Sequence, residues 1–174
     1  MISRHRTVLV AVVALIVAAA LSGCSFIGAP APASTPANQE GASRTLADVE
    51  EALTEIPGVQ FTAARAWDGT TASVIATLSA TDAFTGDRAA LIDYALAQLA
   101  SQGEVDRGRL VRFTFDAPGQ TADTTRALLA SLDIDAERYA GGSSLELASA
   151  DLDRRYGSWP AAVPELPPTL GGES

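Results

Sequence analysis

Residues 45–80, TLADVEEALTEIPGVQFTAARAWDGTTASVIATLSA, decide the fold, because they hold the chain's strongest helix signal and its strongest hairpin signal. Apolar residues recur there every three or four positions, the spacing of one helix face: Leu46, Val49, Leu53 and Ile56. Thr45 is a suitable N-cap, with Asp48 three residues later in a capping-box arrangement. Pro57-Gly58 ends the pattern, so we expect a helix from about residue 45 to residue 56.

Two strands are expected directly after this helix. Apolar and polar residues alternate with the period of a half-buried strand; the residues on one face are Val59, Phe61, Ala63 and Trp67 in the first run and Ala72, Val74, Ala76 and Leu78 in the second. Asp68-Gly69 lies between the runs, and a type I′ turn, which needs positive φ at both central residues, favours this dipeptide. The pattern therefore predicts an antiparallel hairpin.

The remainder of the chain continues as an alternation of helices and strands. In chain order we expect a helix over 86–102, a strand over 109–115, a helix over 122–132 and a strand over 144–148. Thr85 and Gly103 are the expected ends of the first of these helices. The order α-β-β-α-β-α-β predicts an α+β two-layer sandwich, with a mixed sheet and all helices on one face. Residues 151–156 allow one or two further helical turns.

The stretch VEEALTEIPGV, residues 49–59, resembles the helix–PGV–strand join of ferredoxin-like heavy-metal-associated domains. The resemblance implies a ferredoxin-like type of mixed sheet. That family binds its metal through a Cys-x-x-Cys ahead of the helix, whereas this chain has no cysteine after Cys24. The family's first strand is also missing from its place, so the resemblance implies a fold and no metal site.

The N-terminal stretch predicts export. Arg4 and Arg6 precede an uncharged apolar run from Val8 to Leu21, whose 14 residues are fewer than the roughly 20 that span a bilayer and typical of a secretory signal. The following Leu21-Ser22-Gly23-Cys24 resembles the lipobox of bacterial lipoproteins. It implies cleavage between Gly23 and Cys24, and acylation of Cys24 by chains such as palmitate. Two acyl chains anchor a protein stably.

The lipobox would hold the protein on the outer face of the cytoplasmic membrane. Two alternatives stay open: an ordinary signal cleaved after Ala18-Ala19-Ala20, and an uncleaved short anchor. The expected organisation is a signal peptide over 1–23, Cys24 with a disordered Pro/Ala/Ser linker over 24–43, one α+β domain over 44–160, and a flexible proline-rich tail over 161–174.

Composition limits the partners. The chain has a net charge of −9, and loss of Arg4 and Arg6 with the signal leaves ten arginines against 21 acids, or −11. A body this acidic repels phosphate backbones, so we expect no nucleic-acid partner. All 12 basic residues are arginines and alanine is abundant, a composition typical of high-GC genomes such as those of actinobacteria.

The predicted mature chain lacks histidine, lysine and a free cysteine, three side chains that often act as bases or nucleophiles. His5, the only histidine, lies in the signal, and there is no lysine. We therefore expect no Ser-His-Asp catalysis, no zinc site, no Schiff base and no cofactor. Asp133-Ile134-Asp135-Ala136-Glu137 resembles the opening of a calcium loop, but Arg138 stands at the sixth position and Ser144 at the twelfth, where such loops need glycine and glutamate. A solvated loop is the simpler interpretation.

Five residues are candidates for a ligand-facing surface: Trp67, Arg109, Arg112, Tyr139 and Trp159. Arg112 alternates with Phe113, which fits either a ligand-facing sheet or a solvated arginine opposite core aromatics. The other rings either line a groove or pack inside.

Two functions remain. The first is a non-catalytic binding module of the cell envelope, which recognises a protein or a wall component. The second is a carboxylate-dependent cell-wall enzyme or enzyme accessory subunit, which a deep cleft with two facing acids would favour.

Overall fold

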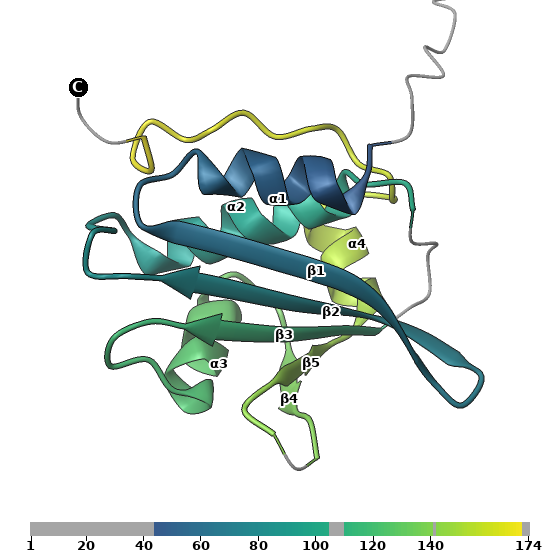
Figure 1. The fold of residues 1–174 in the computed structure, drawn as a ribbon. Helices are drawn as coiled ribbons and strands as arrows, with labels where there is room; N and C mark the ends of the chain where they lie inside the picture. Colours follow the sequence, from purple (N-terminus) through teal and green to yellow (C-terminus); the bar gives the residue numbers. More distant parts are fainter. Residues whose placement is uncertain (1–43, 105–109, 141, 172–174) are drawn as a thin grey trace, which may run out of the picture. The chain divides into compact units, whose positions relative to one another are not determined.

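The computed structural model describes residues 44–104, 110–140 and 142–171 (Figure 1). The predicted signal peptide, Cys24, the linker and Arg109 lie outside these residues. Nine elements are described: α1 Leu46–Thr54, β1 Val59–Asp68, β2 Thr71–Ala80, α2 Arg88–Ala100, β3 Leu110–Asp116, α3 Ala122–Ser131, β4 Ala136–Arg138, β5 Leu145–Leu147 and α4 Ser149–Tyr156. The α+β class is confirmed, with β4 as an element that the sequence did not predict.

The five strands form one mixed sheet in the order β1-β2-β3-β5-β4. Neighbours are antiparallel except β2 and β3, which are parallel and joined by the crossover helix α2. The ferredoxin-like resemblance is not confirmed. In this chain the two parallel strands are hydrogen-bonded neighbours, whereas the ferredoxin-like fold is built on a split βαβ unit.

The β1–β2 hairpin turns one residue later than predicted. Asp68 pairs with Thr71, so Gly69 and Thr70 form the turn and the Asp68-Gly69 assignment is wrong. Gly69 has φ +60, and glycine at the first central position is what a type II′ turn requires. The register moves by two residues as a result, and a two-residue shift keeps each side chain on its expected face.

Helix caps decide where the helices begin. The Thr45 hydroxyl accepts the Asp48 N–H at 3.1 Å and the Asp48 carboxylate accepts the Thr45 N–H at 2.7 Å, which confirms the predicted capping box of α1. The predicted cap of α2 at Thr85 is wrong. Asp87 caps that helix by accepting the Ala90 N–H at 2.7 Å, and the helix ends at Ala100.

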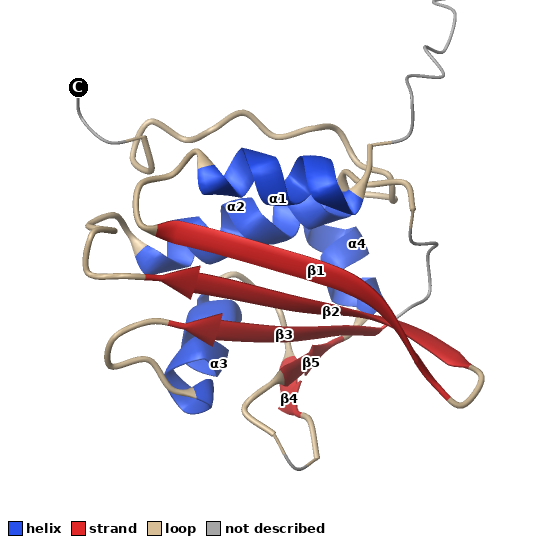
Figure 2. Cartoon of the chain, in the orientation of Figure 1, coloured by secondary structure: helices blue, strands red, loops and turns tan. Residues whose placement is uncertain are grey.

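All four helices pack on one face of the sheet (Figure 2). One cluster of buried side chains joins the two layers; it includes Leu53 of α1, Leu96 of α2, Leu129 of α3, Leu152 of α4, and Val74, Leu78, Val111, Phe113, Leu145 and Leu147 of the sheet. Helix α2 is central, since eight of its 13 residues are buried and it contacts the other three helices. The opposite face of the sheet is bare of described helices.

The packed structure continues past residue 160, where the sequence placed a flexible tail. The Ala161 N–H donates to the carbonyl of Ala100 at 2.8 Å, and Leu170 is only 3% exposed. We call residues 161–170 the strap. In Figure 1 it is the yellow segment that runs along the helix layer.

Among the residues that the structure describes, no helix combines the length and apolar character needed to cross a bilayer.

Candidate functional site

The sheet face that points away from the helices, here called the open sheet face, contains the candidate site. Alternation along the strands assigns these residues to it: Thr62, Ala64, Ile75, Thr77, Arg112, Thr114, Glu137, Tyr139, Ser144 and Glu146. Half of these side chains carry a hydroxyl, and the charged ones are on β3, β5 and β4. The residues named from β1 and β2 are uncharged and include the exposed Ile75.

Arg112 and Tyr139 are in contact at the end of this face that carries the charged side chains. The guanidinium carbon of Arg112 lies 3.9 Å from the centre of the Tyr139 ring, and both residues are half-buried. At this distance the cation is attracted by the negative face of the ring. Arg112 is on β3, whereas Tyr139 follows β4, two strands away in the sheet. The arginine therefore reaches across β5 to make the contact.

Hydrogen bonds to Ser144 set the position of Tyr139. Its backbone N–H donates to the Ser144 carbonyl at 3.0 Å, which continues the β4–β5 pairing beyond Arg138. The hydroxyls of Ser144 and Thr114 are 3.0 Å apart and tie the same point to β3. The tyrosine is thus held from two strands.

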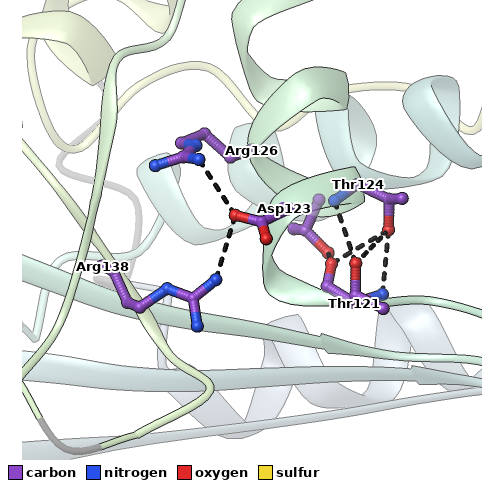
Figure 3. Close-up of polar contacts among 6 residues, drawn as sticks. Thr121, Asp123, Thr124, Arg126 and Arg138 are labelled. Atoms are coloured by element: carbon purple, nitrogen blue, oxygen red, sulfur yellow. Dashed lines mark hydrogen bonds and ion pairs between the residues drawn. The ribbon is translucent and has the colours of Figure 1, made fainter.

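Arg138 fixes the other side of the β4 edge (Figure 3). Its guanidinium donates to the carboxylate of Asp123, in the first turn of α3, at 3.0 Å. The same carboxylate accepts a hydrogen bond from Arg126 at 2.9 Å. Thr121 caps this helix. Exposed ion pairs of this kind contribute little to the free energy of folding. This one shows that the Arg138 side chain is directed toward α3. Because Arg138 points to the helix side, the next residue, Tyr139, points to the open sheet face.

Two glutamates share the site, and the sequence analysis did not select them. Glu137 and Glu146 are directly opposite each other in the antiparallel β4–β5 pair, and Arg112 is opposite Glu146 on β3. Side chains in such positions have Cβ atoms about 4.5–5.5 Å apart, where two like charges destabilise a sheet. Arg112 supplies an opposite charge in the same row. This pairing of glutamates was missed from the sequence because β4, with only three residues, is too short to show a strand pattern.

The calcium-type stretch over residues 133–137 is not simply a solvated loop, because β4 begins within it. Ile134, its second residue, is buried in the core, and the Asp135 N–H donates to the Asp151 carboxylate at 3.1 Å. Within the described ranges, no group of three or more His, Cys, Asp or Glu side chains could hold a metal ion.

The structure brings together two of the five predicted ligand-facing residues, Arg112 and Tyr139. Trp67 is 62% exposed but lies on β1, at the opposite edge of the sheet from β4. Trp159 is partly buried and packs against the core, which is the structural alternative considered for it. Arg109 is outside the described residues.

A second polar cluster joins α4 to α2. Arg155 donates to both carboxylate oxygens of Asp93, at 2.7 and 2.9 Å, and the Tyr156 hydroxyl donates to Asp93 at 2.7 Å. Burial raises the pKa of Asp93, but the bonds from Arg155 and Tyr156 outweigh burial and hold this pKa below its ordinary value. Burial and the Asp93 bond together raise the pKa of the Tyr156 hydroxyl. The cluster therefore keeps an ionised carboxylate, suited to locking two helices and unsuited to acid catalysis.

Comparison with known proteins returned no match: no family model fits the chain, and no curated protein or solved structure is significantly similar to it. The functional argument consequently rests on the residues and their geometry.

Proposed function

We propose that this protein is an exported lipoprotein, anchored by acyl chains on Cys24 at the outer face of the cytoplasmic membrane, and that its domain is a non-catalytic binding module of the cell envelope. The anchor is supported by the basic start, the 14-residue apolar run and the Leu21-Ser22-Gly23-Cys24 join. The fold adds no functional argument, because the ferredoxin-like resemblance is unconfirmed.

The binding surface that we assign is the open sheet face around Arg112 and Tyr139. The observation that supports it is the 3.9 Å contact between the Arg112 guanidinium and the Tyr139 ring. The contact joins a residue of β3 to the residue after β4, on a face bare of described helices. A guanidinium held against a ring has lost part of its rotational freedom, so less entropy is lost when a ligand binds. The ligand is an envelope protein or a wall component, since the acidic body disfavours nucleic acid.

The alternative, a carboxylate-dependent wall enzyme, draws on one observation. Glu137 and Glu146 are directly opposite each other on the same face, and retaining glycosidases use two neighbouring carboxyl groups about 5 Å apart. Such an enzyme also needs one carboxyl with a raised pKa, which takes burial or an unbalanced like charge. Glu137 is exposed, and Arg112 shares the row, so binding is the better supported function.

Cosedimentation with isolated envelopes tests the assignment. We expect Arg112→Gln and Tyr139→Ala each to reduce retention of the protein on envelope fragments at least tenfold. Arg126→Gln is the matched control, because it removes an exposed arginine from the helix side of the fold and should leave retention unchanged. Equal retention of all three variants and the unmodified protein would refute the site.

The enzyme alternative has its own readout. If the purified protein releases soluble fragments from cell walls, and Glu137→Gln or Glu146→Gln abolishes the release, the enzyme function replaces the binding function.

A further inference from the structure

The strap has a three-residue repeat of burial. Ala161, Pro164 and Pro167 are half-buried and Leu170 is buried, whereas both residues in each interval between them are exposed. This repeat matches neither a helix, with 3.6 residues per turn, nor a strand, with two. It is the period of a polyproline II helix, which has three residues per turn and no internal hydrogen bonds.

The strap's backbone bonds fit that conformation from Ala161 to Pro167. Beyond Pro167 the Leu170 N–H donates to the Pro167 carbonyl at 2.9 Å, so residues 168–170 form a turn. The strap's N–H at Ala161 donates to the Ala100 carbonyl at 2.8 Å, and its carbonyl at Pro164 accepts from the Gln98 side chain at 3.4 Å. Both partners belong to α2 or its C-terminus. A polyproline II helix leaves its carbonyls available for such external donors. One face of the strap therefore packs along α2.

The strap and α2 border a groove whose lining contains two tyrosine rings as well as charged residues. A depression at this place is lined by Ala90, Tyr94 and Ala97 of α2, Tyr156 of α4, and Pro164 and Pro167 of the strap itself. Alanines leave room for proline rings, and tyrosine rings offer flat surfaces for them. Domains that bind proline-rich peptides use the same combination, an aromatic-lined groove that receives a preformed polyproline II helix.

Gln98 gives the groove a fixed polar group. It is buried, its side-chain amide donates to the Tyr94 hydroxyl at 2.6 Å as well as to Pro164, and its carbonyl oxygen accepts from Arg44. A buried amide fully engaged in this way cannot rotate freely, so its donor stays directed at the strap. The groove thus has a defined recognition point for a backbone carbonyl.

The strap does not fill the groove. A second depression lies at its far end, lined by Pro57, Phe84, Gly86 and Leu170 among others. Val163 and Leu166, on the outer face of the strap, remain 60% and 37% exposed. The strap is held by the buried Leu170, the half-buried Pro164 and Pro167, one backbone bond and a long bond to Gln98. A ligand that makes additional contacts in either depression can therefore bind the groove more tightly than the strap does.

We propose that this groove on α2 is a recognition site for polyproline II segments, that the chain occupies it with its own residues 161–170, and that a proline-rich segment of a partner protein displaces them. The strap indicates the partner's pattern: two prolines three residues apart, followed by a turn that buries an apolar side chain. This site is on the helix layer and is independent of the open sheet face.

A labelled synthetic peptide with the sequence of residues 160–171 tests the proposal by fluorescence anisotropy with the full chain. Apparent affinity scales with the fraction of molecules whose groove is open. We expect Leu170→Ala, which weakens the strap's own docking, to bind the peptide at least tenfold more tightly than the unmodified protein. Val163→Ala is the control and should leave the affinity unchanged. A peptide with alanine at both groove-facing prolines should not bind.

Three results would overturn the proposal. The first is a folded Leu170→Ala protein whose affinity for the peptide equals that of the unmodified protein. The second is equal binding of the alanine-substituted peptide. The third is a strap-exchanged dimer of the unmodified protein in light scattering, because the occupant would then be a second copy. Should Leu170→Ala fail to fold, Pro164→Ala with Pro167→Ala loosens the strap without emptying the core, and the same tenfold gain is required of it.

Discussion

Truncation of Leu170 to alanine tests whether the strap is part of the folded domain. The side chain is 3% exposed and belongs to the main core cluster, although it lies ten residues beyond the domain end expected from the sequence. Removing roughly three methylene equivalents at about 0.8 kcal/mol each costs about 2.4 kcal/mol. Leucine-to-alanine changes in cores cost about 2–5 kcal/mol, and a segment near a chain end relaxes into part of the space. We therefore expect a loss of about 2–3 kcal/mol.

Urea and thermal unfolding, followed by circular dichroism, measure this loss. For a domain of this size it corresponds to a melting temperature lower by roughly 7–11 °C. Val163→Ala, on the exposed side of the strap, is the matched control and should change stability by less than about 0.5 kcal/mol. If the two variants melt together, the strap does not contribute to the fold and the domain ends near residue 160.

Three further predictions follow from other parts of the chain. Because the pKa of Asp93 is lowered in the folded protein, its contribution to stability is present at neutral pH and lost as the pH falls below about 4; Asp93→Asn should therefore lower the melting temperature at pH 7 and flatten its fall in acid, unlike the exposed control Asp82→Asn. Gly58→Ala should destabilise the fold by about 1–3 kcal/mol in urea unfolding, since Gly58 has φ +75 and a Cβ would lie 2.7 Å from the Phe84 nitrogen; Gly69, with open space around it, is the comparison site. Cys24→Ala should release the protein from membranes or leave the precursor uncut, and a mature protein without acyl chains in mass spectrometry would contradict lipidation.

Local patterns predicted the first half of the domain well. The capping box at Thr45, the helix that follows it and the hairpin strands depend on neighbours within a few residues, and those interactions are visible in sequence. The turn position was missed by one residue, because Asp68-Gly69 and Gly69-Thr70 both satisfy turn chemistry and pairing along the whole hairpin decides between them.

The candidate site was only partly predictable. Alternation on β3 singled out Arg112, and Tyr139 was selected as one of the aromatic rings that either line a groove or pack inside. Their contact depends on β4, a three-residue strand that forms by pairing with β5 and whose Arg138 is directed to Asp123 on α3. A strand this short has no periodicity of its own, and its partners are distant in the chain. Glu137 and Glu146 were overlooked for the same reason.

By itself the sequence determined the α+β class, the order of the main elements, the acidic charge and the shortage of catalytic side chains, since these depend on composition and on periods of two and 3.6 residues. Only the tertiary structure decided the sheet order, the Arg112–Tyr139 stack and the docking of the strap. Each of these joins residues that are far apart in the chain, through contacts whose free energy appears only when the layers have packed. The strap is the clearest case: its three-residue repeat acquires meaning only against the surface of α2.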